Sequence, residues 1–198
     1  FIGCHIKGVK NGPSPDWLQR KLKSVGLRPI SALVDITNLM TLDLNRPLHV
    51  FDADKINGNI HVRLAKNGET LSALNDKTYT LTDTMTVVCD DSGVLGLGGI
   101  IGGTSTGCTD DTVNVFVDAA YFDPLRTART GRALQIESDA RYRFERGIDP
   151  AFTREGLDIA TQLIVDLCGG TPHDVVVAGM GPDWQRTIAF RPERVLTL

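Results

Sequence analysis

The chain has 198 residues, of which 41% are hydrophobic and 23% are charged. This composition predicts a folded globular protein with one substantial core or two small ones, and it excludes disorder as the dominant state. The net charge of −3, from 21 basic and 24 acidic side chains, argues against a protein that coats nucleic acid by bulk charge.

The four cysteines, Cys4, Cys89, Cys108 and Cys168, form no CxxC pair. Their spacing predicts neither a zinc ribbon nor a dense disulfide framework, and it favours a reducing, cytoplasmic environment. No apolar run approaches the roughly 18 residues of a membrane span, and the first residues lack the layout of a signal peptide. Because the chain starts with Phe rather than Met, we expect it to be part of a longer protein.

Two helices are predicted within the first forty residues. Ser14 is expected to cap the first, with Pro15 at the first helical position and Gly26 at the end. The second is expected to follow Ser31, through SALVDITNLM.

Between residues 60 and 117 the pattern changes to short β-branched runs separated by turn residues, which predicts an antiparallel sheet or a small barrel. The runs are IHVRLA, TLSAL, TYTL, MTVVC, VLGLGGII and VNVFVD. The seven glycines from Gly93 to Gly107 indicate either a packing bend or a place where a ligand approaches the backbone. The string GTSTG at residues 103–107 matches a nucleophile elbow, but a β-branched run follows it, so a plain turn is predicted.

Three helices are predicted after the strands. Asp123 and Pro124 are expected to open the first, Ser138 to cap the second, and Asp149 and Pro150 to open the third. The order of helices, strands and helices predicts the α+β class, with an antiparallel β-rich core and flanking helices. Residues 1–172 are predicted to form one domain. Residues 173–198 are predicted to be a linker and the truncated start of the next domain, with a strand and turn in TIAFRPERVLTL.

The charges are unevenly distributed along the chain. Residues 1–40 carry +4, residues 41–120 carry −6, and the stretch from Arg126 to Arg154 holds seven arginines against four carboxylates. Two basic zones that the fold brings together could follow a phosphate backbone. The alternative is that these arginines lie on solvated helix faces.

His49 precedes Asp52 and Asp54 in NRPLHVFDAD. A metal-dependent hydrolase built on these three residues is one hypothesis, although H-x-x-D-x-D is not a spacing with strong precedent and we expect no metal site. His49 is also suited to general acid–base chemistry, because its ordinary pKa is near 6.5. A histidine that only hydrogen-bonds a neighbouring carbonyl is the simplest interpretation.

Several long strings are specific to a family. RPISALVDITNLMTLDLNRPLHVFDADKI, GLGGIIGGTSTG, VDAAYFDPLRTARTGRAL and SDARYRFERGIDP stand in an order and spacing that resemble the β subunit of bacterial phenylalanyl-tRNA synthetase, in its central editing domain. The resemblance implies a Greek-key-like β core and hydrolysis of tyrosine wrongly attached to tRNA(Phe). It also implies assembly with the α subunit in an (αβ)₂ heterotetramer. No cofactor is implied in this fragment, since the intact synthetase uses ATP and magnesium elsewhere.

The same resemblance implies which residues form the editing pocket. His49, Asn38 and Thr37 would orient the attacking water or the terminal ribose. The implied substrate-binding residues are Asp118, Gly98, Gly99, Ser138, Ala140 and Arg28. The family commonly has Glu at the position of Asp118. Because Asp is one methylene shorter, its carboxylate lies about 1.5 Å farther back. Ser138 stands in place of a frequent Thr.

The physical argument for such a pocket starts from the difference between tyrosine and phenylalanine, which is one hydroxyl. An apolar pocket rejects an added hydroxyl by only about a hundredfold, so a second site that demands the hydroxyl is needed. Asp118 could be the acceptor, with Gly98 and Gly99 offering bare backbone and Ala140 a low wall. The competing hypothesis is a non-catalytic tRNA-docking or structural module with a degenerate pocket.

Overall fold

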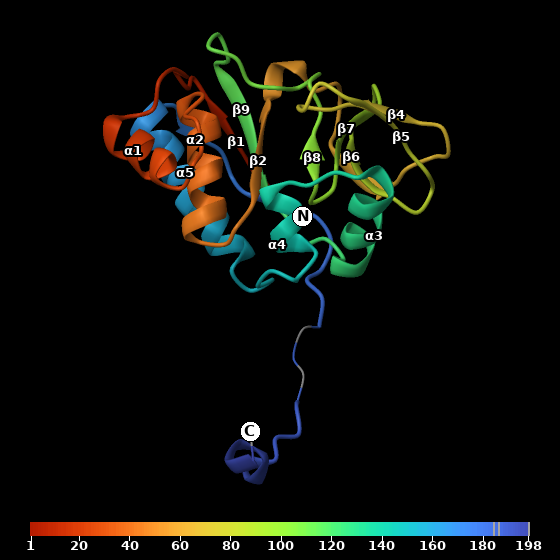
Figure 1. Cartoon of the computed structure of the whole chain (residues 1–198). Coiled ribbons are helices and arrows are strands. Elements are labelled where there is room, and N and C mark those ends of the chain that lie inside the picture. The colour runs from red at the N-terminus through yellow and green to blue at the C-terminus, as the bar shows by residue number, and fades with distance from the viewer. Residues whose placement is uncertain (184, 186, 198) are drawn as a thin grey trace.

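The structure is a computed structural model that describes residues 1–183, 185 and 187–197. It confirms the α+β class with antiparallel sheets (Figure 1). The helices are α1 (Asp16–Ser24), α2 (Ala32–Asp43), α3 (Pro124–Leu134), α4 (Asp139–Phe144) and α5 (Thr153–Cys168), with 3-10 turns η1 (Ala53–Lys55) and η2 (Pro192–Thr197). The strands are β1 (Ile2–Lys7), β2 (Leu48–Asp52), β3 (His61–Leu64), β4 (Thr70–Ser72), β5 (Thr78–Thr80), β6 (Thr86–Cys89), β7 (Val94–Leu97), β8 (Ile101–Gly102), β9 (Asn114–Ala119), β10 (Thr171–Pro172) and β11 (Val176–Val177).

The main sheet has the strand order β10-β1-β9-β2, and β11 also pairs with β1. Because side chains alternate across a strand, β9 contributes to both faces of this sheet. Val115 and Val117 point into a core shared with the helices, whereas Phe116 and Asp118 point the other way. The sequence patterns predicted β9 but did not predict β1 or β2, the two strands that flank it.

Helices α1, α2 and α5 cover one face of the main sheet (Figure 1). Leu18 and Leu22 of α1 are fully buried there. The predicted cap of α1 is wrong in its detail, because the Ser14 hydroxyl does not bond the helix and instead donates to the Asp35 carboxylate at 2.5 Å. Asp35 also accepts from the amide of Ile30, so this buried carboxylate joins the entrances of α1 and α2.

On the other face of the main sheet lie a second sheet, of order β3-β6-β7-β8, the β4-β5 hairpin, and helices α3 and α4 (Figure 1). The predicted caps of both helices are confirmed. Asp123 accepts from the amide of Arg126 at the start of α3, and Ser138 accepts from the amide of Arg141 at the start of α4. The string GTSTG forms a turn after β8, as expected.

A fully buried arginine joins the two sides of the molecule. Arg46, which precedes β2, donates from Nη1 to the carbonyl of Ala120 at 3.2 Å and from Nη2 to the carbonyl of Asp149. Its guanidinium lies over the Phe152 ring at 5.9 Å. Gly156 of α5 leaves room for it, since a Cβ there would lie 2.8 Å from the Arg46 Cγ. Burial lowers the pKa of Arg46 to about 10, so the side chain stays cationic at pH 7.

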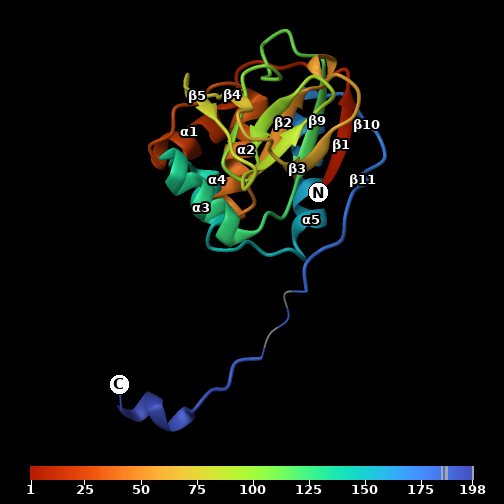
Figure 2. The same ribbon diagram turned by 90° about the vertical axis from the view of Figure 1, so that its right-hand side faces the viewer.

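After α5 the chain returns to the main sheet, where β10 and β11 lie along β1 (Figure 2). The domain boundary at residue 172 stays a prediction. The strand expected in TIAFRPERVLTL is not formed within residues 187–197, where η2 follows an extended segment, and Leu198 lies outside the described residues. Among the described residues, no helix combines the length and apolar character needed to cross a bilayer.

Helices α1 and α3, which carry much of the two basic zones, lie on opposite sides of the main sheet. Helix α1 lies in the helical layer on one side of the main sheet, and α3 lies beyond the opposite face (Figure 1). Arg154 of the second zone is on α5, in the same layer as α1, so the arginines of the second zone are divided between the two sides of the main sheet.

Candidate functional site

A cavity of about 160 Å³ lies between the main sheet, the β7-β8 hairpin and α4. An apolar cavity of about 150 Å³ is large enough to hold benzene, so this one has room for a single aromatic ring. Its lining is mostly apolar. The lining residues are Pro47, Leu48, His49, Phe51, Val88, Leu95, Gly96, Leu97, Gly98, Gly99, Ile100, Ile101, Gly102, Asp118, Ala120, Phe122, Ala140 and Phe144.

Two polar side chains face each other within this apolar lining. His49 of β2 and Asp118 of β9 are direct partners in the antiparallel register, so their side chains leave the same face of the sheet, with Cβ atoms about 4.5–5.5 Å apart. Asp118 is 5% exposed. Asp118 Oδ1 and His49 Nε2 are both inaccessible to solvent and lack a hydrogen-bond partner within the described part of the chain. Buried polar atoms are normally paired, so these two are exceptions, and a ligand that reaches them would supply the missing partner.

Burial shifts the ionisation of both groups toward their neutral forms. Desolvation raises the pKa of Asp118 from 3.8 to about 7 and lowers the pKa of His49 from 6.5 to about 4. His49 is therefore a neutral imidazole at pH 7, whereas Asp118 becomes a carboxylate as the pH rises through 7. The pair can thus offer one strong acceptor and one neutral base.

Gly102 determines where the imidazole lies. A Cβ on Gly102 would lie 2.4 Å from His49 Cε1, a separation that real Cβ atoms essentially never show. The ring also packs edge-on against Phe51, with centroids 4.3 Å apart. Gly102 and Phe51 together hold the imidazole against the cavity wall.

Gly98 and Gly99 line the cavity, but in a different way from the one expected. A Cβ on Gly98 would lie 2.7 Å from the Phe122 ring, and one on Gly99 would lie 3.0 Å from Phe122 and Phe144. Both glycines therefore admit aromatic rings of the protein itself. The Gly98 amide donates to the carbonyl of Thr86 and is not free for a substrate. The amide of Gly99 makes no hydrogen bond to the described residues.

Ala140 lies in the lining, whereas Ser138 does not. The Ser138 hydroxyl donates to the carbonyl of Ile100 at 2.6 Å and accepts from the amide of Arg141 at 3.0 Å. The Ser138 hydroxyl is thus engaged within the protein, and the role of Ser138 in substrate binding stays a prediction. Its hydroxyl joins α4 to the turn that carries Gly98 and Gly99.

Besides Ser138, three of the residues implied by the resemblance lie outside the cavity lining. Thr37 and Asn38 are half-buried on α2, and the Thr37 hydroxyl donates to the Val34 carbonyl of its own helix. Arg28 is exposed in the connection between α1 and α2. Their roles toward a ribose or an acceptor end stay predictions.

The three residues of the metal-hydrolase hypothesis do not converge. His49 and Asp52 leave opposite faces of β2, because they are separated by an odd number of positions. Asp52 pairs with Lys55 at 3.0 Å and accepts from the Thr112 hydroxyl, and Asp54 accepts from Asn114. No group of three or more His, Cys, Asp and Glu side chains suited to a metal occurs among the described residues.

Sequence reasoning missed the aromatic part of the site. Phe122 and Phe144 pack edge-on with centroids 5.2 Å apart, and with Phe51 they belong to one buried cluster. The sequence indicated Ala140 as a low wall of the cavity but did not indicate the aromatic rings that line it. No local signal marks the phenylalanines, because they come from a loop, a helix and a strand that meet only in the fold.

Residues 1–169 match the B3/4 domain family, and the chain belongs to this family. It is 59% identical over 198 residues to the phenylalanine–tRNA ligase β subunits of Paramagnetospirillum magneticum and Ruegeria pomeroyi. In both cases all of the chain is covered, but only 25% of the relative, so the chain spans about a quarter of the length of these proteins. The resemblance inferred from the sequence strings is confirmed.

Among solved structures, the chain is similar to an N-terminal fragment of the phenylalanyl-tRNA synthetase β subunit from Pyrococcus horikoshii. The identity is 20% and the TM-score is 0.42, with 59% of this chain and 37% of that one covered.

Proposed function

We propose that this chain is the editing domain of a phenylalanine–tRNA ligase β subunit and hydrolyses tyrosine from mischarged Tyr-tRNA(Phe). The observation that supports this most directly is the buried Asp118 carboxyl group, whose Oδ1 lacks a hydrogen-bond partner among the described residues, in an aromatic-lined cavity of about 160 Å³. The intact protein would assemble with an α subunit in the cytoplasm as an (αβ)₂ heterotetramer. Synthesis of Phe-tRNA would take place elsewhere in that assembly.

Asp118 would discriminate between tyrosine and phenylalanine. A tyrosine ring in the cavity would donate its phenol O–H to the carboxylate, whereas a phenylalanine ring would leave this buried acceptor unpaired. The cost of such an unpaired group is about 1–3 kcal/mol, which corresponds to roughly 5- to 150-fold in selectivity. Ala120 and Ala140 keep the walls short enough for the ring to enter.

The His49 imidazole is the second polar group of the cavity, on the same sheet face as Asp118. Its unpaired Nε2 would accept a hydrogen bond from the water that attacks the ester carbonyl and orient it, because the imidazole stays neutral at pH 7. Aminoacyl esters are already reactive, so acid–base help of about 10²–10⁴ suffices. We propose that no cofactor or metal from this chain takes part.

The decisive experiment compares Asp118→Asn with the parent in the intact synthetase, with preformed Tyr-tRNA(Phe) and Phe-tRNA(Phe) as substrates. We expect kcat/KM for Tyr-tRNA to fall by about 10- to 100-fold, because the amide is a weaker acceptor for the phenol. Phe-tRNA hydrolysis should change little. Wild-type rates on Tyr-tRNA in the variant would contradict the proposal.

Asp54→Asn is the matched control. Asp54 is exposed and accepts from Asn114, a bond that the asparagine amide oxygen can keep. The editing proposal expects unchanged hydrolysis in this variant and no inhibition by a chelator. The metal-hydrolase hypothesis expects a loss of activity in both cases, and the degenerate-pocket hypothesis expects no Tyr-tRNA hydrolysis even in the parent.

Gly102→Ala should slow editing without unfolding the domain. The new methyl group overlaps His49 Cε1, so the imidazole must leave its place against Phe51. We expect kcat for Tyr-tRNA hydrolysis to fall at least tenfold, with a loss of stability of about 1 kcal/mol. Gly12→Ala is the control, because a Cβ at Gly12 meets nothing within 4 Å. Equal rates in the two variants would remove His49 from the mechanism.

A further inference from the structure

Helix α4 presents two different faces. Ala140 and Phe144 point into the cavity, whereas Tyr142 is on the outside with 58% of its surface exposed. The Arg146 guanidinium lies over the Tyr142 ring at 3.7 Å from its centroid, and that of Arg143 lies at 6.0 Å. Helix α4 therefore carries part of the cavity wall on one face and an exposed aromatic ring, flanked by two cations, on the other.

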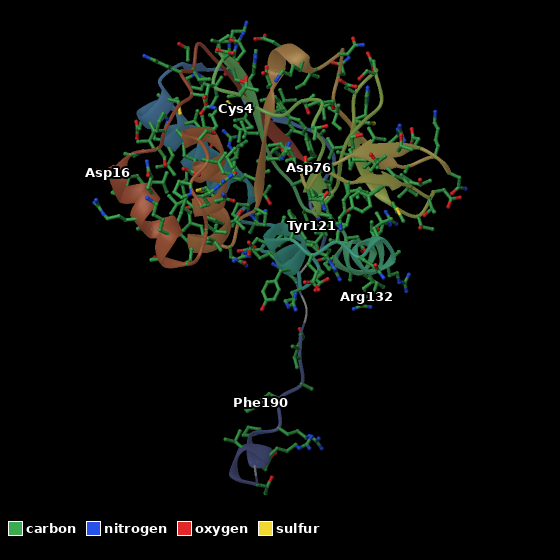
Figure 3. The ribbon with its side chains drawn as sticks, turned by 45° about the horizontal axis from the view of Figure 1, so that its top comes forward. Cys4, Asp16, Asp76, Tyr121, Arg132 and Phe190 are labelled. Atoms are coloured by element: carbon green, nitrogen blue, oxygen red, sulfur yellow. The ribbon has the colours of Figure 1, made fainter. Side chains whose placement is uncertain are left out.

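Helix α3 packs beside α4 and adds three more cations. Arg126, Arg129 and Arg132 recur every third residue on its exposed side, and Figure 3 shows Arg132 at the outer surface of the helix. None of the ion pairs among the described residues includes these three arginines.

The arginines of α4 differ, since Arg143 pairs with Asp139 and Arg146 pairs with Glu145. Over residues 123–146 the six arginines exceed the four carboxylates, although the whole chain is acidic. The unpaired positive charge of this region is therefore on α3, and the exposed aromatic ring is on α4.

We propose that this α3–α4 surface, made of Arg126, Arg129, Arg132 and Tyr142, binds the single-stranded end of the RNA whose ester enters the cavity. The arginines would contact successive phosphates, and Tyr142 would stack on a base, the combination typical of surfaces that bind single-stranded nucleic acid. This inference rests on the proposed function and deepens it, because it says which surface holds the RNA while the aminoacyl group is in the cavity.

The test uses the intact synthetase with Arg126, Arg129 and Arg132 changed together to Gln. On Tyr-tRNA(Phe) at about 150 mM salt we expect KM to rise about tenfold or more. The slope of log kcat/KM against log salt should become shallower by about 2, since each lost phosphate contact on a single strand removes about 0.7. On 3′-tyrosyl-adenosine, which has no phosphates, the parent and the variant should react equally.

Tyr142→Leu should raise KM on Tyr-tRNA about fivefold or more, and Tyr142→Phe should restore it, because base stacking needs the ring and not the hydroxyl. The matched control is Arg20→Gln with Lys23→Gln on α1. These exposed cations lie on the other side of the main sheet, and the double variant should behave as the parent.

The outcomes separate the surface proposal from the function on which it rests. If the parent hydrolyses neither substrate, the proposed function fails and this surface proposal fails with it. If the parent hydrolyses both and the triple variant keeps its KM and salt slope on Tyr-tRNA, only the surface proposal fails. Loss of the oligomer in the triple variant, seen by size-exclusion chromatography, would assign the surface to a protein partner and overturn the RNA proposal.

Discussion

Asp118→Asn is expected to stabilise the folded chain by up to about 4 kcal/mol at pH 8. In the unfolded chain the carboxyl group ionises near pH 3.8, but burial in the cavity raises its pKa to about 7. Holding it neutral up to that pH costs stability at about 1.36 kcal/mol per pKa unit. The cost is absent below pH 3.8, grows between pH 3.8 and 7, and is constant above. Asparagine is of similar size and carries no charge.

Urea unfolding of the parent and the variant at pH 4, 6 and 8 measures this directly. The difference in unfolding free energy should be near zero at pH 4 and should increase with each step. His49 does not disturb the comparison, because it is present in both proteins. Asp54→Asn, at an exposed site, should stay within about 0.5 kcal/mol of the parent at every pH. A pH-independent difference for Asp118→Asn would show that the carboxyl group is solvated.

The same substitution is expected to weaken Tyr-tRNA hydrolysis, so stability and proofreading should change in opposite directions. A group that recognises a buried phenol must be desolvated before the substrate arrives, and the folded chain carries that cost. This opposition is expected of a binding site and not of a core position, where polar burial would be satisfied within the protein.

Arg46→Ala is expected to destabilise the chain by about 3 kcal/mol. The substitution leaves a large void at a position that is 0% exposed and removes the donors to the carbonyls of Ala120 and Asp149. An unpaired buried carbonyl such as that of Ala120 costs about 1–3 kcal/mol, and the part-buried carbonyl of Asp149 costs less. The substitution also removes a buried cation that has no carboxylate in a salt bridge with it within the described part of the chain, and this removal is favourable. The expected loss of stability is therefore smaller than the sum of the void and the unpaired carbonyls.

Thermal or urea unfolding at pH 7 checks this value, and Arg154→Ala is the matched control. Arg154 pairs with Asp158 at 3.0 Å on the exposed side of α5, so its removal should cost less than about 1 kcal/mol. A stability loss in Arg46→Ala no larger than in Arg154→Ala would mean that the buried guanidinium contributes no net stability.

Local patterns predicted the helices and the middle strands because their signals lie within a few residues. Ser138 and Asp123 cap helices, as their positions before α4 and α3 indicate. Ser14 looked equivalent in sequence, but its hydroxyl bonds Asp35, a partner 21 residues away. Strand β1 was missed for the same kind of reason, since it pairs with β9, β10 and β11 from the far part of the chain.

The amino-acid sequence alone was enough to infer the fold class, the family resemblance and the two central polar residues, His49 and Asp118. The folded chain was needed to see that these two residues are partners in one strand register. It also shows that Phe122 and Phe144 fill the spaces at Gly98 and Gly99, and that the Ser138 hydroxyl is already hydrogen-bonded. Caps and periodicity act over one or two turns of chain. The burial that leaves Oδ1 of Asp118 unpaired depends on strands and helices that are distant in sequence and meet only when the chain folds.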